Sequence, residues 1–400
     1  MMSWRLLVVP VFAFGLNPAF AFEKIAILDT RDFSTHFDTE TLQGLTQVVD
    51  HVLLTGADRI LQRHHCGGLP RYATKEGDLS LQAVSLDKRR LPNYSPLNAW
   101  LDYAGTGFDQ LTEINRICAG RGVATGMHYT LEEAHNCAWS LDGWNLAHPQ
   151  YWCRGTNGIP WHGHCSIAYP EVLEHKLAVV DEIIARGGDF FYVDPCRYGS
   201  WKPKFEYVEP VLAEWRRRHG NRPPPANPMN EDWLRVVSKF QRDYFRAIRG
   251  RLDRVPRKIR FLMGVEHVGH PGSGWTYRFN WYAHAIDWQA LRDEGIIDGI
   301  VVENLRPSVD RLWQDTERLC REIVKDAKCP VYLPIMAYCF GEKRPGYPQY
   351  AKWSGLGEAE AVGRLLRIAA DAGAAGITME CVDYRNYSPE VCRTIKNFVP

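Results

Sequence analysis

Six ionisable residues each stand at the end of a short apolar run. They are Asp29, His128, Asp194, Glu266, Glu303 and Glu380. A core strand has no physical need to end in a carboxylate, and several carboxylates brought together repel one another. A helix cap or a salt bridge explains any one of them taken alone. Six together favour a shared site, and paired carboxylates in such a site are suited to breaking glycosidic bonds.

Glycosidic hydrolysis needs two carboxyl roles. One acid donates a proton to the leaving oxygen, and a second carboxylate attacks the sugar or activates water. Asp194 is the better candidate for the second role, because it closes an apolar run and Pro195 keeps its backbone out of helix. Glu266 is the better proton donor, which needs a raised pKa from burial and like charge. Glu303 competes for that role, but Arg306 nearby favours its ionised form, which suits a base or a hydroxyl ligand.

Further residues near the strand ends are candidates for holding a ligand. The predicted substrate-binding residues are Arg31, Arg63, His64, Arg197, Asn304, Arg306, Tyr338, Glu380 and Trp161. Arginine binds carboxylates through two parallel hydrogen bonds, so these residues fit an acidic sugar. The competing interpretation is that the arginines only neutralise the ring of acids.

One long segment, 130–169, concentrates aromatic residues. It carries Trp139, Trp144, Trp152 and Trp161, and also His148, His162 and His164. Tryptophan can stack on the face of a sugar. These rings could equally form the core of their own loop, braced by disulfides among Cys137, Cys153 and Cys165.

The elements that position these residues alternate along the chain. Strand-like apolar runs occupy 24–28, 59–62, 122–127, 189–193, 259–265, 299–302, 330–335 and 375–379. Helical patterns occupy 41–54, 108–121, 171–186, 231–252, 308–327 and 358–372. Alternating strands and helices predict a parallel sheet, and eight strands predict a (β/α)8 TIM barrel, with long loops (67–103 and 130–169) after strands 2 and 3. A doubly wound open sheet is the rival, but no G-x-G-x-x-G motif follows an early strand.

Composition and the first residues indicate the compartment. With 48 Lys+Arg against 47 Asp+Glu, the net charge of +1 argues against a nucleic-acid partner. Arg5, the apolar run 6–14 and the Ala19-Phe20-Ala21 end predict a signal peptide over 1–21, leaving a single catalytic domain over 22–400 in the periplasm or outside the cell. No later apolar run is long enough for a membrane span, so no membrane partner is expected.

Export would permit disulfides. Beyond the loop cysteines, the candidate pairs are Cys320 with Cys329 and Cys381 with Cys392, and an odd total of 11 leaves at least one thiol unpaired. No C-x-x-C pair occurs, which argues against structural zinc. Carbohydrate hydrolysis by carboxylates needs no cofactor.

Two stretches resemble a known group of barrels. The segment from Tyr169-Pro170-Glu171-Val172 to the strand ending at Asp194, and the stretches 285–288 and 294–299, are similar to bacterial glycosyl-hydrolase-like (family 10-like) proteins. The resemblance covers about a third of the chain and implies a TIM barrel acting on a polysaccharide or glycan. It supplies no catalytic pair. The chain departs from clan-A glycosidases, which have Glu on strands four and seven, and from α-amylase-like enzymes, because Tyr192 stands where they have Arg.

Three alternatives remain open. Asp29 and His128 as an acid/base pair resemble family 156 exo-sialidases, in which arginines would bind the sugar carboxylate. His64-His65 or His162 and His164 could ligate zinc with Asp194 in a metal-dependent hydrolase. A non-catalytic carbohydrate-binding barrel would keep the tryptophans without needing its carboxylates to converge.

Overall fold

The structure is a computed structural model. It describes residues 21–29, 33, 37–39, 41–66, 69–70, 108–131, 143–195, 202–266, 281, 284–305, 307–336, 350–380, 382 and 387–400. The predicted signal peptide therefore lies almost wholly outside the described residues, as do Arg31, Arg197, Arg306, Tyr338, Trp139, Cys137 and Cys381.

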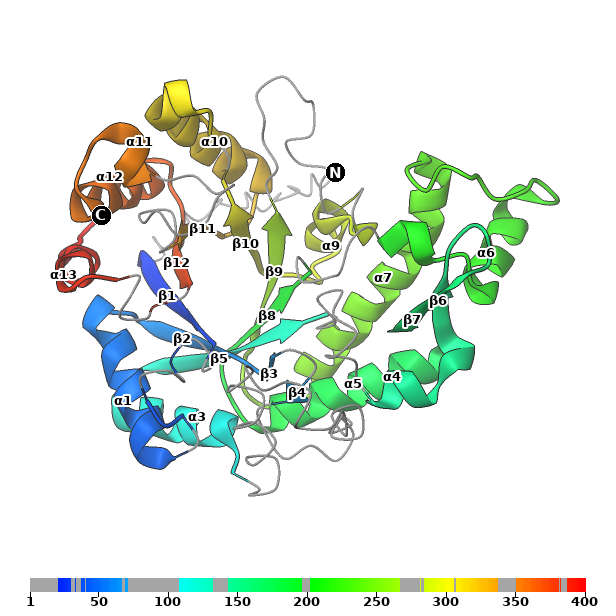
Figure 1. The fold of residues 1–400 in the computed structure, drawn as a ribbon, viewed down its shortest axis with the longest axis horizontal. Helices are drawn as coiled ribbons and strands as arrows, with labels where there is room; N and C mark the ends of the chain where they lie inside the picture. The colour runs from blue at the N-terminus through cyan, green and yellow to red at the C-terminus, as the bar shows by residue number, and fades with distance from the viewer. Residues whose placement is uncertain are drawn as a thin grey trace, which may run out of the picture.

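Eight parallel strands close into a barrel in the order β1-β12-β11-β10-β9-β8-β5-β2 (Figure 1). Their bounds are β1 Glu23–Leu28, β2 Arg59–Arg63, β5 Ala124–Thr130, β8 Phe190–Asp194, β9 Arg260–Glu266, β10 Gly299–Asn304, β11 Val331–Met336 and β12 Gly376–Glu380. The predicted (β/α)8 barrel and each of its eight strands are confirmed. β5 ends later than predicted, because it continues beyond His128, which pairs with Tyr192 inside the ladder.

Helices surround the barrel, and the six predicted ones are present. They are α1 Leu42–Val52, α3 Gln110–Gly120, α5 Pro170–Ala185, α7 Glu231–Leu252, α10 Leu312–Ala327 and α12 Glu358–Asp371. Side chains cap several of them, as where Asn230 accepts from the backbone N–H groups of Asp232 and Trp233 at the start of α7. Among the described residues, five more were not predicted: α4 Gly143–Ala147, α6 Glu209–His219, α9 Trp288–Asp293, α11 Tyr350–Ser354 and α13 Pro389–Asn397. Within the described ranges, no helix combines the length and apolarity that crossing a bilayer requires.

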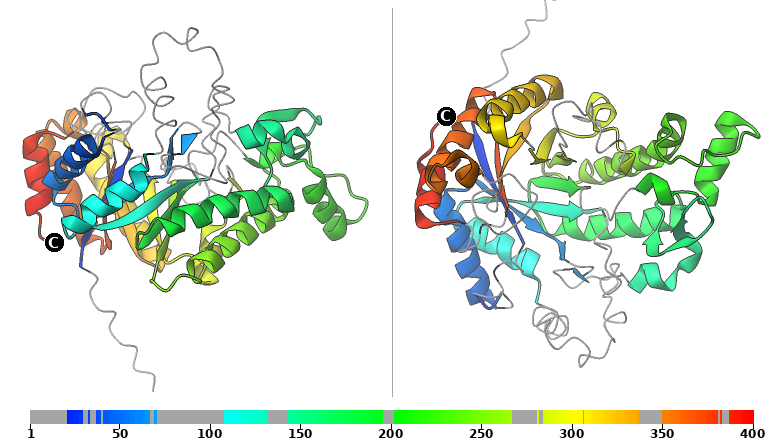
Figure 2. Two further views of the ribbon diagram at one scale, coloured as in Figure 1. Left: turned by 90° about the horizontal axis from the view of Figure 1, so that it is seen from below. Right: turned by 45° about the horizontal axis from the view of Figure 1, so that its top comes forward.

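A small unit stands beside the barrel, at the far ends of α5 and α7 (Figures 1 and 2). It contains α4 Gly143–Ala147 and an antiparallel hairpin of β6 Trp152–Arg154 and β7 Pro160–Cys165, with α6 next to it. Trp144 stacks on His148 with ring centroids 4.1 Å apart, and the Trp152 indole N–H donates to the Asn145 carbonyl. These contacts lie within the segment, but both tryptophans are only partly buried and pack against the main core, and Trp144 also stacks on His175 of α5 with ring centroids 4.1 Å apart.

The predicted disulfides are wrong. Cys153 and Cys165 form no disulfide. The Cys153 thiol contacts Glu206 Oε1 at 3.7 Å, whereas the Cys165 thiol contacts the Asn145 and His148 carbonyl oxygens at 3.9 and 3.8 Å, so the two sulfur atoms have different neighbours. Cys320 and Cys392 are free, buried thiols on the core-facing sides of α10 and α13, which also excludes a Cys381–Cys392 bond. Cys329 lies nine residues beyond Cys320 and past the end of α10. This separation along the helix places the two Cα atoms farther apart than the roughly 7 Å that a disulfide allows.

The barrel interior is layered. At its N-terminal end Arg59 and Arg260 both bind Glu23, at 3.0 and 2.8 Å, and the Tyr332 hydroxyl donates to the same carboxylate at 2.6 Å. Burial raises the pKa of Glu23, but the hydrogen bonds from Arg260 and Tyr332 and the charge of Arg260 outweigh it and lower that pKa overall. Above this polar layer, Ile27 and its inward-facing neighbours form an apolar layer. It lies directly below the mouth of the barrel, which is the C-terminal end of its strands.

Candidate active site

The strand pleat brings the predicted residues to one mouth. Successive side chains of a strand point to opposite faces, so residues two apart share a face. The inward apolar cluster includes Ile27, Leu61, Tyr192, Leu262 and Val301. On four of these strands the next inward residue is ionisable: Asp29, Arg63, Asp194 and Glu303. On the fifth strand it is Gly264, and the inward residue after that is Glu266. These residues meet at the C-terminal end of the barrel, where TIM-barrel enzymes place their active sites.

Asp194 is held by His128. The His128 Nε2 and Asp194 Oδ2 atoms lie 3.1 Å apart, and each side chain is 1% exposed. The ladder sets this contact, because β5 and β8 pair Thr130 with Asp194 and His128 with Tyr192. The His128 Nδ1 atom is buried and has no hydrogen-bond partner among the described residues. The pair therefore fixes the Asp194 carboxylate and puts a titratable imidazole directly beside it.

Glu303 is held by Tyr192, whose hydroxyl donates to the Glu303 Oε1 atom. A hydroxyl donated to a carboxylate stabilises its negative charge. The β9–β10 ladder is irregular at this point, with a shift between Val302 and Asn304, and bulges next to active sites commonly re-aim a side chain. Glu303 thus suits a base, a nucleophile or a charge stabiliser better than a proton donor.

Gly264 lies against both Glu303 and Pro195, the residue that follows Asp194. A Cβ placed on Gly264 would lie 2.5 Å from Glu303 Oε1, 2.9 Å from Pro195 Cδ and 3.0 Å from the Tyr192 hydroxyl. The Glu303 carboxylate and the backbone that carries Asp194 therefore both pack against this glycine. Only a residue without a side chain leaves this space open.

Glu266 and Glu380 lie nearer the rim. Glu266 follows Gly264 by two residues on the same strand and pairs with Asn304, and its side chain is half-buried. Glu380 is also half-buried and pairs with Ile27 on one side and Met336 on the other. Partial exposure lets a carboxyl exchange its proton with water, which a proton donor must do once in every turnover.

Asp29 binds Arg63 instead of His128. The Arg63 Nη1 atom lies 2.8 Å from Asp29 Oδ2, with side chains 3% and 10% exposed. His64, the next residue, faces the helix side of the sheet: its Nδ1 lies 3.0 Å from the His128 carbonyl, and its ring lies 4.8 Å from that of Tyr129. This pairing favours the interpretation in which an arginine balances the acidic ring.

The remaining predicted residues lie farther from these contacts or outside the described parts. Trp161 belongs to β7, where it stacks on His164 at 3.7 Å and contacts Phe205 at 4.4 Å. Arg31, Arg197, Arg306 and Tyr338 lie outside the described residues. The ligand-binding roles of all five stay predictions. Among the residues that the structure describes, no three His, Cys, Asp or Glu side chains are grouped to hold a metal ion, so His162 and His164 do not gather with Asp194; the His65 side chain lies outside the described part.

Sequence reasoning missed two contributors, Tyr192 and Gly264. Tyr192 was noted only as a departure from α-amylase-like enzymes, although its place two residues before Asp194 puts both on the inward face. Gly264 interrupts an apolar strand, and a glycine in a strand often marks a close approach of other atoms.

Comparisons with known proteins support the fold. No family model matches the chain, and no curated protein matches its sequence. The GH20 exo-β-N-acetylglucosaminidase of Vibrio harveyi is similar in structure, with a TM-score of 0.50 at 13% identity, over 95% of this chain and 55% of that one. A β-N-acetylhexosaminidase from Bacteroides fragilis is similar with a TM-score of 0.52 at 12% identity, over 94% of this chain and 66% of that one. A β-galactosidase from Marinomonas ef1 is similar with a TM-score of 0.54 at 10% identity, over 94% of this chain and 58% of that one.

The chain thus spans between about half and two thirds of these structures. At such low identity, the likeness shows that this chain has the barrel fold that these glycosidases also have.

Proposed function

We propose that this protein hydrolyses a glycosidic bond in a polysaccharide or glycan. The observation that carries the proposal is that Asp194 and Glu303 stand at the barrel mouth on the two strands that flank β9, each held by its own partner. Asp194 acts as the nucleophile or base, and Glu266 as the proton donor. The glycosidase names of structural neighbours support the reaction class, although they identify neither the sugar nor the linkage.

The charges suit the transition state of this reaction. Cleavage of a glycosidic bond passes through an oxocarbenium-like state with positive charge on the sugar ring. Two fixed carboxylates stabilise that charge without reorganising, because His128 and Tyr192 already hold them. Glu266, which is half-buried nearer the rim, donates its proton to the leaving oxygen and regains one from water.

The test is turnover of a panel of aryl glycosides by the full chain and its variants. Asp194→Asn is expected to lose activity on every active substrate. Glu266→Gln is expected to lose about 100-fold or more on substrates with poor leaving groups and much less on dinitrophenyl glycosides, which need no proton. Glu294→Gln on α9 is the matched control, because Glu294 makes surface ion pairs with Arg242 and Arg246.

The same panel separates the alternatives. It includes an aryl sialoside, because an exo-sialidase would act through Asp29 and His128. Equal turnover by Asp194→Asn and the unmodified chain on an active substrate would overturn the proposed role of Asp194. Binding of glycans without any turnover would instead identify a carbohydrate-binding barrel. Hydrogen NMR of the first-formed anomer would then assign a retaining or inverting course.

A further inference from the structure

A second pocket lies outside the barrel mouth, between the outer helices α7 and α9. Its volume is about 200 Å³. The apolar part of its lining consists of Phe245, Ile286 and Leu291, all buried, and Trp281 stands at its edge. The Trp281 indole N–H donates to the Glu231 carboxylate at 3.0 Å, which fixes the ring there. The pocket thus offers an apolar floor and an aromatic wall.

The polar lining of this pocket is strongly positive. Four cationic side chains line it: Arg218, Arg235, Lys239 and Arg242. The one acidic residue in the lining is Asp287, whose carboxylate already accepts from the Ala290 backbone N–H at the start of α9. The wall that a ligand meets therefore favours an anion.

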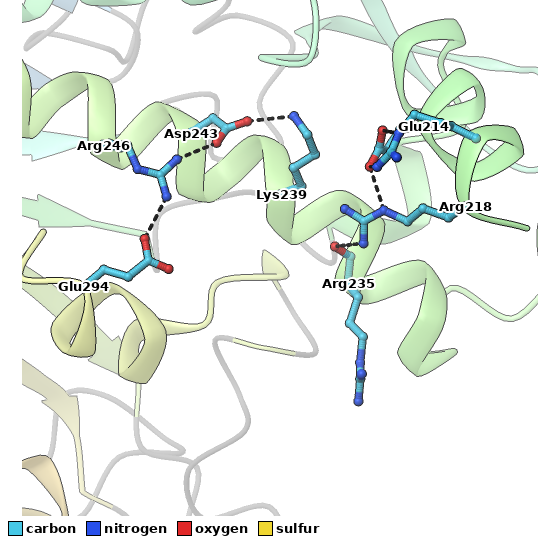
Figure 3. Close-up of polar contacts among 8 residues, drawn as sticks. Glu214, Arg218, Arg235, Lys239, Asp243, Arg246 and Glu294 are labelled. Carbon is cyan, nitrogen blue, oxygen red and sulfur yellow. Dashed lines mark hydrogen bonds and ion pairs between the residues drawn. The ribbon is translucent and has the colours of Figure 1, made fainter.

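The carboxylates that pair with these cations are not among the residues that line the pocket, and Figure 3 shows Glu214 beside Arg218 and Asp243 beside Lys239. The pairs are Arg218–Glu214 at 2.6 Å, Lys239–Asp243 at 2.8 Å and Arg242–Glu294 at 3.2 Å, with Arg246 joining Asp243 to Glu294. These pairs hold three of the cationic side chains in position. Arg235 makes no ion pair within the described residues, and its side chain extends away from the others in Figure 3.

Two buried polar atoms of this pocket lack hydrogen-bond partners in the part of the chain that the structure describes. They are Oε1 of Gln241, a residue 2% exposed, and Nε of Arg242. An unsatisfied buried polar atom costs about 1–3 kcal/mol, so such atoms call for a ligand or water. The amide oxygen needs a donor such as a hydroxyl, and the guanidinium nitrogen needs an acceptor.

We propose that this pocket binds one acidic sugar residue, a hydroxylated ring that carries a carboxylate or sulfate group. The anion meets the cationic wall, a ring hydroxyl donates to Gln241, and the C–H face of the ring packs on Trp281 and the apolar floor. A volume of about 200 Å³ is smaller than the roughly 300–1,000 Å³ of sites for drug-sized ligands, which fits a single ring. The proposal does not depend on the reaction at the barrel mouth.

Calorimetric titration of the full chain tests the ligand class. Sodium glucuronate is expected to bind at least tenfold more tightly than glucose, which lacks the charge, or inorganic sulfate, which lacks the ring. Sulfate that binds as tightly as glucuronate would reduce the pocket to a general anion site and overturn the assignment of a sugar. Failure of all three probes to bind would overturn the proposal entirely.

Variants place the binding in this pocket. Gln241→Leu is expected to weaken glucuronate binding at least tenfold while the melting temperature stays the same or rises, because it removes an unsatisfied buried amide. Arg235→Glu should weaken binding similarly, whereas the same change at Arg254, an exposed residue beyond the end of α7, should not. Asp194→Asn should bind glucuronate as the unmodified chain does. Loss of binding in Asp194→Asn with full binding in Gln241→Leu would move the site to the barrel mouth and overturn the proposal.

Discussion

The substitution Gly264→Ala tests the centre of the candidate site without removing any group that does chemistry. The new Cβ would lie 2.5 Å from Glu303 Oε1, so that oxygen must retreat by about 0.9 Å to reach an ordinary contact of 3.4 Å. It would also lie 2.9 Å from Pro195 Cδ, a ring atom tied to the backbone, which cannot swing away as a long side chain can. Both carboxylate positions are therefore expected to shift.

The magnitudes follow from these distances. Misplacing a reacting group by about 1 Å can cost roughly 100-fold in rate, so kcat on an active aryl glycoside should fall by about that factor. Overpacking typically costs about 1–3 kcal/mol of unfolding free energy. Denaturant unfolding and initial-rate kinetics on the same preparation measure the two effects separately.

Two other glycines serve as controls. Gly250 in α7 has open space around its Cβ position, so Gly250→Ala should stabilise the protein by about 0.5–1 kcal/mol and leave kcat unchanged. A Cβ on Gly126 would lie 2.5 Å from both Leu61 Cδ2 and Phe190 Cβ, below the mouth. Gly126→Ala should therefore destabilise the barrel. If Gly264→Ala matched the unmodified chain in both kcat and stability, the reasoning that seats Glu303 on this glycine would be refuted.

Three further predictions concern charge and thiols. The pKa of Glu23 in the folded state is lowered from its ordinary value of 4.5, so its stabilising contribution is complete above that pH and is lost as the pH falls below it towards the lower folded pKa. In thermal melts, the stability difference between the unmodified chain and Glu23→Gln should therefore narrow as the pH is lowered below about 5. Asp29→Asn removes the charge that faces Arg63 in their buried ion pair and should lower the free energy of unfolding in urea by about 1–3 kcal/mol, which an unchanged free energy of unfolding would contradict. Burial raises the pKa of the Cys118 and Cys320 thiols to about 12, so iodoacetamide should label neither in the native protein and both after unfolding without reductant, as mass spectrometry would show.

The barrel could be predicted because its strands carry a local signal. Each strand is a short apolar run, and every barrel strand except β11, which ends at Met336, closes on a polar residue or is followed by one. The hairpin of β6 and β7 was not predicted, because the segment 130–169 was interpreted as one long loop. Asn157-Gly158 nevertheless marks the turn between the two strands. Similarly, Pro210 and Gly220 bound α6 as start and stop residues.

The partners within the site could not be predicted in the same way. That His128 binds Asp194, and that Tyr192 binds Glu303, depends on the register between strands that are distant in sequence. Disulfide pairing failed for a related reason, because spacing along the chain does not reveal which side of a helix or hairpin a cysteine occupies.

The closure of the barrel has a consequence for the order of folding. β1 pairs on one side with β2 and on the other with β12, so Glu23 finds Gly376 near the opposite end of the chain. During synthesis, one edge of β1 waits unpaired until the last strand has emerged, and contacts so distant in sequence form slowly. An open strand edge is a template for pairing with other chains. Translation that stalls before β12 would therefore release an unclosed sheet whose free edge can pair with other chains.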